Sequence, residues 1–343
     1  MLSTLQPYEW DAAVVSYPQH SFLQSYDWGE FQKKHGRNVE RYCIRHCNGR
    51  YAIAQILSHP LPFFGWYGYC PRGPLMEEGQ NTSFLASLSA ELRKQRALFL
   101  RIEPPTFTPT VKGIVQIAPM QPADVWIVDL SQPFDVLQSL MHPKTRYNYR
   151  IAQKKGISIQ MISSPYDNNF EKAISDFIGL LARTAGRHQF RLHTDDYYRQ
   201  MITFFIRNLS ESKTNISLRL YAAYRGATPL AAILVLYFGS TATFLHGGSD
   251  YRFRHLMAPY ALHMQAIQDA AELGFTSYDM GGIAHTDDPH DSWQGITRFK
   301  KGFSGYSLHY PGTFDIVFNS FHYLAYSKFR QVRSRLRSSM DRT

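Results

Sequence analysis

The stretch ERYCIRHCNGRYAIAQIL, residues 40–57, decides the fold because it is one half of a pattern that the chain uses twice. Its two apolar runs flank Asn48-Gly49, a dipeptide typical of the tight turn between antiparallel strands. The stretch LRLYAAYRGATPLAAILVL, residues 218–236, repeats this arrangement and turns at Arg225-Gly226. Both stretches therefore predict β-hairpins.

The residues after each hairpin extend the repeat. Each half continues with a third strand, a helix and a closing strand, predicted over residues 64–69, 82–96 and 99–103, and over residues 241–246, 260–273 and 277–280. Strands and helices in this order predict an α/β (α+β) layered fold. Used twice, the order outlines two tandem halves of the GNAT type, the acyl-CoA N-acyltransferase fold, that share a cleft. Between the halves, helices are predicted over residues 137–155, with a break near Pro143, and over residues 170–185.

We place the first half at residues 1–150, the second at 151–315 and a basic C-terminal helix or tail at 316–343, whose closing segment is expected to pack on the first half. Composition agrees with a packed globular chain, since 44% of the 343 residues are hydrophobic and 15% are aromatic. The N-terminus lacks the features of a secretory signal, and no apolar run is long enough to span a bilayer. The sequence therefore predicts a cytoplasmic protein with reduced cysteines.

The net charge of +10 favours polyanionic partners such as nucleic acid or an anionic membrane face. One predicted helix carries a basic face, and the C-terminal tail is also basic. Without a known partner, such faces are ordinary solvated surfaces. With an RNA partner, the cations of the helix become candidates for phosphate contact. They are Lys144, Arg146, Arg150, Lys154 and Lys155.

Two stretches near the C-terminus carry the strongest chemical signal. YDMGGI, residues 278–283, predicts a strand that ends in a glycine turn, and GITRFKKGF, residues 295–303, places three cations among apolar and aromatic residues. Rings around a charge exclude water and strengthen its field, which favours a site for an anionic or polarised ligand. The alternative is a surface loop with solvated lysines.

These two stretches resemble the C-terminal signature of the Fem peptidyltransferases (FemA, FemB and FemX), which build the cross-bridges of peptidoglycan. The resemblance covers about residues 20–315, because other segments match in order: SYDWG at 25–29, PRGP at 71–74, LRIEP at 100–104, KTRY at 144–147 and APYA at 258–261. It implies an aminoacyltransferase that moves Gly, Ala or Ser from aminoacyl-tRNA to the side-chain amine of the diamino acid in a stem peptide. The implied acceptor is lipid II or UDP-MurNAc-pentapeptide. We expect a monomer without a cofactor that contacts the inner face of the membrane peripherally.

The resemblance also assigns roles to single residues. Lys300 aligns with the lysine that stabilises the tetrahedral oxyanion, and Phe299 with an aromatic residue that meets the tRNA acceptor end. Glu103 aligns with an acidic residue that accepts or orients the attacking amine's proton, although an ion pair with Arg101 or another cation is an equal alternative. Arg298 and Lys301 are assigned to phosphate or water.

The acceptor cleft is implied to include Phe244 and His246, which a regular strand would place on one face, together with Tyr260. Two positions depart from the family pattern. Gln32 replaces a lysine that binds the nucleotide-linked acceptor, with Lys33 next to it, and His193 replaces an arginine, with Arg191 two residues earlier. These departures leave the choice between a lipid-linked and a nucleotide-linked acceptor open.

Two other function classes remain. A coenzyme-A-dependent N-acyltransferase would need a glycine-rich phosphate loop, but residues 249–260 contain no glycine, and Arg72-Gly73-Pro74 offers one beside a proline. A non-catalytic module that binds RNA or a membrane surface would not need Lys300. No metal is predicted, because His285, Asp287, Asp288 and His290 lie in a polar, proline-containing loop.

Overall fold

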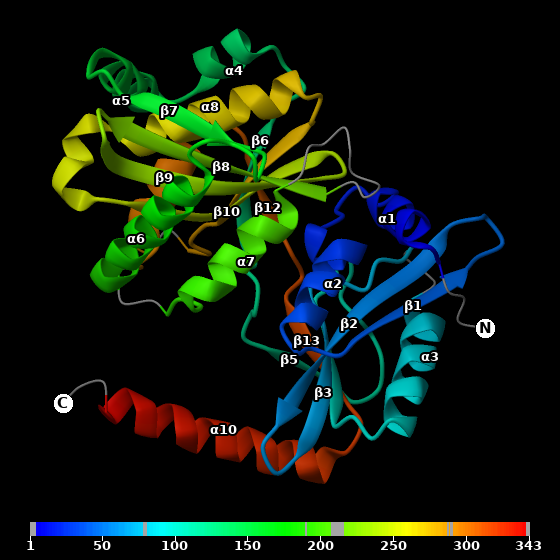
Figure 1. Ribbon diagram of the computed structural model, residues 1–343. Coiled ribbons are helices and arrows are strands. Elements are labelled where there is room, and N and C mark those ends of the chain that lie inside the picture. Colours follow the sequence, from blue (N-terminus) through cyan, green and yellow to red (C-terminus); the bar gives the residue numbers. More distant parts are fainter. Residues whose placement is uncertain are drawn as a thin grey trace. The chain divides into compact units, whose positions relative to one another are not determined.

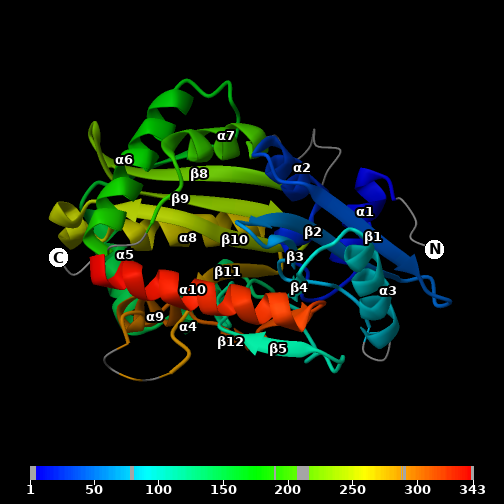
Figure 2. The ribbon, with the colours of Figure 1, turned by 90° about the horizontal axis from the view of Figure 1, so that it is seen from below.

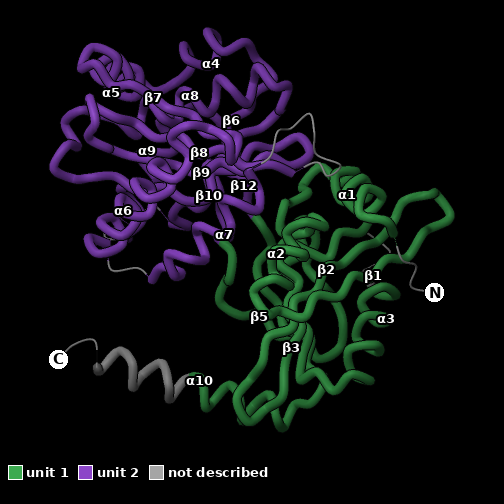
Figure 3. The backbone as a smooth tube through the Cα atoms, in the orientation of Figure 1, with its two compact units in different colours: residues 1–121, 310–343 green, residues 122–309 purple. Residues whose placement is uncertain are grey.

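The computed structural model describes residues 5–77, 81–188, 191–206, 216–286, 288 and 291–340 (Figure 1). The chain divides into two compact units, Met1–Gln121 with Tyr310–Thr343, and Pro122–His309 (Figure 3). This division differs from the predicted boundary near residue 150, because the strand at residues 124–129 and the two helices after it belong to the second unit.

Unit 1 is built on a mixed six-stranded sheet in the order β1-β2-β3-β4-β13-β5. The predicted hairpin is present, with Gly49 in the turn at a φ of 84° that favours glycine. The closing strand β13 comes from the C-terminal part of the chain and pairs antiparallel with both β4 and β5. The strands are β1 (Val39–Arg45), β2 (Tyr51–Leu61), β3 (Gly65–Cys70), β4 (Phe99–Ile102), β5 (Ile114–Ile117) and β13 (Thr313–Val317).

The helices of unit 1 follow local signals. Ser25 caps α2 by accepting a hydrogen bond from the Trp28 amide, as serine does at helix starts. The helix predicted between the third and fourth strands is α3, and its buried Leu88 and Leu92 join the core under the sheet. The elements are α1 (Pro7–Val15), η1 (Phe22–Gln24), α2 (Tyr26–Lys34), α3 (Asn81–Lys94) and α10 (Ser320–Met340).

Unit 2 holds a seven-stranded sheet in the order β12-β6-β11-β10-β9-β8-β7. Its central strands β8 and β9 are buried along nearly their whole length, as expected of strands covered on both faces. The strands are β6 (Asp124–Asp129), β7 (Ser158–Ile162), β8 (Ile216–Arg225), β9 (Thr228–Phe238), β10 (Thr241–Ser249), β11 (Ser277–Gly282) and β12 (Tyr306–His309).

Helices cover both faces of this sheet: α6 and α7 lie on one side, and α8 with α5 on the other (Figures 1 and 2). The break predicted near Pro143 is confirmed, since Pro143 is the first residue of α5. The helices are α4 (Phe134–Leu140), α5 (Pro143–Lys154), α6 (Phe170–His188), α7 (Asp195–Phe205), η2 (Tyr251–Leu256), α8 (Ala258–Glu272) and α9 (Gln294–Lys301).

The two sheets repeat one topology, which confirms the predicted pair of GNAT-like halves. In each, two antiparallel pairings are followed by a parallel one across a helix, β3 to β4 and β10 to β11. Each parallel strand then pairs antiparallel with a strand from a distant part of the chain, β13 in unit 1 and β6 in unit 2. Within the described residues, no helix is long and apolar enough to cross a membrane.

Candidate active site

Helix α9 carries the three cations of the GITRFKKGF stretch and divides them between its two faces. Arg298 and Lys301 are exposed, whereas the Lys300 side chain is buried, with 6% of the residue exposed. The Lys300 Nζ donates a hydrogen bond to the Gly282 carbonyl oxygen at 2.7 Å. The expectation of a charge among rings is met, and the alternative of a solvated loop does not hold for Lys300.

Burial changes the acid–base behaviour of Lys300. It lowers the pKa of the ammonium to about 8, and the negative charge of Asp279 opposes this shift. In the part of the chain that the structure describes, no carboxylate lies within ion-pair distance of Nζ. Lys300 is therefore a cation held out of water by packing, with one carbonyl acceptor.

An irregular segment of β11 supplies the acceptor for Lys300. The pairing of β11 with β6 shifts between Asp279 and Gly282, and the Asp279 side chain accepts a hydrogen bond from the Gly281 amide at 2.6 Å. Gly281 has a φ of 75°, and a Cβ at this position would lie 3.6 Å from the Lys300 Nζ. Gly281 therefore allows the backbone to turn and places no side chain beside the ammonium.

A cluster of aromatic rings lies beside the lysine. The Phe244 ring centroid lies 6.0 Å from Nζ, and Phe244 in turn contacts His263 with ring centroids 4.8 Å apart. Phe299 packs against Tyr260 and His263, at 4.9 and 5.4 Å, and against Phe303 at 5.2 Å. The structure therefore brings together Lys300, Phe299, Tyr260 and Phe244, four of the residues predicted for the site.

One residue of this cluster that was not predicted is His263. His263 is buried, its Nδ1 lies 2.9 Å from the Tyr278 hydroxyl oxygen, and burial together with the Lys300 charge lowers its pKa to about 3. His263 is thus neutral beside Lys300 and adds no competing positive charge. The signal was present in the sequence, because His263 lies three residues after Tyr260 and so shares its helix face.

The prediction that Phe244 and His246 share one strand face is wrong. A bulge between them breaks the alternation of β10, since Phe244 pairs with Val235 and His246 with Leu234, the next residue along β9. Phe244 therefore contacts α8 through His263, and His246 contacts Tyr198 of α7 at 5.2 Å on the other face.

His246 belongs to a second aromatic group. His193 stacks on Tyr197 with centroids 4.1 Å apart and also contacts Tyr198, so both predicted histidines meet at α7. Burial, aided by the charge of His193, lowers the pKa of His246 to about 4. Arg191 is exposed just before this group.

Most of the cations predicted for tRNA phosphates lie exposed on α5 and α9: Lys144, Arg150, Lys154, Lys155, Arg298 and Lys301. The two helices meet at Gly302, whose carbonyl accepts a hydrogen bond from the His142 amide and whose position leaves no room for a Cβ against Thr145. Arg146 differs from the others, since its guanidinium donates to the carbonyl oxygens of Ser139 and Met141.

In unit 1 the alternative of an ion pair between Arg101 and Glu103 does not hold. Arg101 instead binds Asp315 through two parallel hydrogen bonds of 2.7 and 2.8 Å, because β13 lies beside β4 and brings Asp315 opposite Arg101 in register. Asp315 also accepts a hydrogen bond from the Tyr323 hydroxyl at 2.8 Å. The Arg101 guanidinium is therefore bound by Asp315. Binding of a substrate by Arg101 would have to compete with this ion pair.

Glu103 is buried and surrounded by donors. Its carboxylate accepts hydrogen bonds from the Tyr69 hydroxyl, the Thr313 hydroxyl and the Gln121 amide at 2.8 to 2.9 Å, and a longer one of 3.3 Å from the Arg72 amide. Gln32 is partly buried on α2, and the exposed Lys33 pairs with Glu30 at 2.9 Å.

The segment where a GNAT enzyme would bind the phosphates of coenzyme A is occupied by η2. Asp250 caps this short helix, and its carboxylate accepts hydrogen bonds from the Arg252 amide and guanidinium and from Arg183. The hydrogen bond from Arg252 lowers the pKa of Asp250 to about 2. The Asp250 side chain thus occupies a backbone amide at the start of η2, the kind of N–H group that would otherwise be available to a phosphate.

Two GNAT-like units in tandem, one with a buried lysine beside a glycine turn, define this chain as a tandem GNAT-type protein. A family model described as the FemAB family matches residues 5–132, 114–211 and 208–331, which together cover most of the chain. The chain belongs to the FemAB family.

Individual relatives agree with this assignment. "Aminoacyltransferase FemA" from Staphylococcus aureus (strain MW2) is 27% identical over 129 residues, which are 37% of this chain and 30% of that protein. The crystal structure of FemX superposes with a TM-score of 0.80 at 18% identity, covering 95% of this chain and 99% of FemX. The structure of L-PGS from Bacillus licheniformis matches at a TM-score of 0.52 and 13% identity, over 87% of this chain and 94% of that one. At these identities, the two structures show a common fold.

Proposed function

We propose that this protein is a tRNA-dependent aminoacyltransferase that adds an amino acid to the stem peptide of a peptidoglycan precursor. The observation that carries the proposal is the buried Lys300 ammonium beside Gly281 in a chain of the FemAB family. The FemA relative, named an aminoacyltransferase, supports the reaction class.

The proposed reaction needs a fixed positive charge at one point. The neutral amine of the stem peptide attacks the ester carbonyl carbon of aminoacyl-tRNA, a C–N bond forms, and the carbonyl oxygen becomes an oxyanion. The C–O bond to the terminal ribose then breaks, the ribose hydroxyl takes up a proton, and the amine loses one. The Lys300 ammonium stabilises the oxyanion and is regenerated unchanged.

The surroundings of Lys300 suit this role. A low-dielectric, ring-lined site strengthens the attraction between an ammonium and an oxyanion. The absence of a side chain at Gly281 leaves a route by which a carbonyl oxygen reaches Nζ, since a Cβ there would lie 3.6 Å from it. Phe299 and Tyr260 are proposed to contact the terminal adenine of the tRNA. The exposed cations of α5 and α9 are proposed to contact its phosphates.

The roles of the remaining predicted residues are also proposals. Glu103 stays the candidate that receives the proton lost by the attacking amine of the stem peptide. Taking up this proton would break one of the hydrogen bonds that Glu103 accepts from Tyr69, Thr313 or Gln121. His246, His193 and Arg191, with Gln32 and Lys33, are proposed to bind the acceptor.

The decisive experiment measures the mass of the acceptor after incubation with purified protein. Charged tRNA is offered with either lipid II or UDP-MurNAc-pentapeptide, separately with glycine, alanine and serine as the amino acid. A mass gain of one residue supports the proposal and identifies the acceptor. Acetylation of the acceptor with acetyl-CoA in place of charged tRNA would instead support a coenzyme-A-dependent N-acyltransferase. Binding of RNA or vesicles without any product would support a non-catalytic binding module.

The role of Lys300 is tested in the same assay. Replacing Lys300 with alanine is expected to lower turnover roughly 10²–10³-fold, the scale for losing one oxyanion donor. Lys301→Ala is the matched control, because Lys301 is exposed next to it on α9 and should affect tRNA binding only. Turnover of Lys300→Ala within about threefold of wild type would remove Lys300 from the mechanism.

A further inference from the structure

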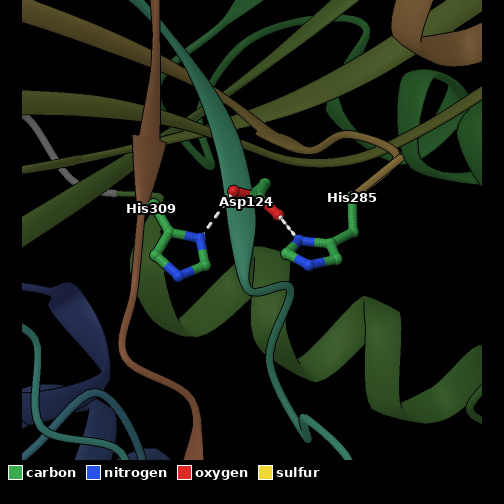
Figure 4. Close-up of side chains that lie close together, drawn as sticks. All are labelled: Asp124, His285 and His309. Carbon is green, nitrogen blue, oxygen red and sulfur yellow. Dashed lines mark hydrogen bonds and ion pairs between the residues drawn. The ribbon is translucent and has the colours of Figure 1, made fainter. Parts of the chain in front are cut away.

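Three side chains outside the Lys300 site converge on one point of unit 2 (Figure 4). The Asp124 carboxylate lies between two histidines, with Oδ2 2.5 Å from the Nδ1 of His285 and Oδ1 2.8 Å from the Nδ1 of His309. The carboxylate is largely buried, with 12% of its side chain exposed, whereas His285 and His309 are 69% and 60% exposed. One ligand atom from each of the three lies within 4.8 Å of the other two.

The sheet itself brings these residues together. Asp124 begins β6, and His309 ends β12 directly opposite it in the antiparallel register. His285 follows β11 on the other side of β6, and the Ile283 amide donates to the Asp124 carbonyl oxygen at 2.9 Å. Asp124 and His309 therefore project from paired strands, and His285 from the segment just after β11 that is hydrogen-bonded to Asp124 at Ile283, so all three are near one another before any ligand binds.

We propose that Asp124, His285 and His309 form a binding site for a divalent transition-metal ion of the zinc class. Two imidazole nitrogens and one carboxylate oxygen are a set of ligands that Zn²⁺, Co²⁺ and Fe²⁺ accept, whereas Mg²⁺ and Ca²⁺ prefer oxygen alone. Ligands of a tetrahedral Zn²⁺ lie about 2.1 Å from the ion and so about 3.4 Å from one another. Small rotations of the two exposed histidines open the present contacts to this spacing.

The site has a consequence for the chain between its ligands. His285 and His309 bracket the segment that contains α9 and Lys300, and both histidines reach the same residue of β6. A bound ion therefore closes a loop whose two ends are fixed at Asp124. We infer that the metal stabilises the placement of α9, as a cross-link that restricts the unfolded segment does.

The first test uses the full chain without a histidine tag. Titration with Zn²⁺ in a calorimeter is expected to give one ion per chain, and Co²⁺ to give the visible absorption of a nitrogen- and oxygen-ligated ion. Zn²⁺ is also expected to raise the midpoint of thermal unfolding in a concentration-dependent way. No saturable binding below about 100 times the protein concentration would overturn the proposal.

Variants then assign the site. Each proposed ligand is replaced in turn, in the variants His285→Ala, His309→Ala and Asp124→Asn. Each variant should weaken Zn²⁺ binding at least ~10–100-fold, because even the loss of a residue that only hydrogen-bonds a metal ligand lowers metal affinity by that factor. His322→Ala removes an exposed histidine outside the cluster and should bind as wild type does. Equal affinity in all four variants would show adventitious binding elsewhere and overturn the site. Circular dichroism without metal checks that each variant is folded, and none of these readouts depends on the proposed aminoacyl transfer.

Discussion

Two buried cations of this protein, Arg101 in unit 1 and Lys300 in unit 2, have opposite surroundings. In unit 1 Arg101 is held by Asp315 through two parallel hydrogen bonds, and this pairing keeps its pKa raised although burial alone would lower it. In unit 2 Lys300 has one carbonyl acceptor and a pKa lowered to about 8. A matched partner offsets the cost of burying a charge, whereas a buried charge without a carboxylate partner costs stability and is retained where chemistry needs it.

The largest expected effect tests the paired cation. Asp315→Ala should lower the free energy of unfolding of the protein by about 3–5 kcal/mol, because it leaves the Arg101 guanidinium buried without its partner. Urea unfolding measures the change. Lys94→Ala, which breaks the exposed pair with Glu91, is the control and should cost at most about 1 kcal/mol. A loss for Asp315→Ala no larger than that of the control would contradict the comparison.

The second prediction concerns pH and the unpaired cation. Between pH 8 and 10.5, the folded protein has released the Lys300 proton while the unfolded chain retains it, so stability due to this group rises with pH. The gain is on the order of 3 kcal/mol over this range, and below pH 8 the full cost of burying the ammonium is present. The free energy of unfolding is measured against pH for the wild type and for Lys300→Met, and the difference between the two curves isolates the contribution of Lys300 from that of the tyrosines. A difference that does not change with pH would refute the lowered pKa of Lys300.

Turnover should move the other way in the same pH range. The proposed mechanism needs the ammonium, so turnover is expected to fall as the pH rises through about 8. Lys300→Arg keeps its charge at these pH values, so its lower activity should lack this decline. An identical decline in both proteins would assign it to another group.

The smallest effect concerns the glycine beside the lysine. Gly281→Ala places a side chain at a φ of 75° and is expected to cost about 1–2 kcal/mol of stability. Gly226→Ala is the matched control, because Gly226 has a φ of 59° and nothing within 4 Å of the added Cβ. Both should lose similar stability, but only Gly281→Ala, whose Cβ lies 3.6 Å from Nζ, should lower turnover. Equal turnover would show that the space beside Lys300 is not used.

Local signals in the sequence predict much of the fold. The hairpins at Asn48-Gly49 and Arg225-Gly226, the start of α5 at Pro143 and the helices α3, α6 and α8 depend on neighbouring residues, and all were found. The short strands β6 and β13 were not found, because their partners lie far along the chain. For the same reason the sequence offers Glu103, two residues away, as a partner for Arg101 and gives no sign of Asp315, 214 residues away.

The candidate site was predicted in part. Family resemblance points to Lys300, whereas a run of cations by itself predicts an exposed face. Lys300 is buried because of its position on α9 and the aromatic side chains around it, which the sequence pattern does not show. The alternation of a regular strand puts Phe244 and His246 on one face of β10. The bulge between them puts them on opposite faces, and the sequence pattern does not reveal this bulge. Asp124 and His309 share no motif with His285, and the three meet only through the pairing of β12 with β6 and the return of the chain to β6 after β11.

Strand β13 gives the protein an order of assembly during synthesis. A ribosome completes every residue of unit 2 before it reaches Thr313–Val317, the strand that lies between β4 and β5 in unit 1. Until then, the nascent unit 1 has β4 with an unpaired edge and Arg101 without its counter-ion. The sheet of unit 1 is therefore completed only after unit 2 has been synthesised, and the edge of β4 is open to other partners until then.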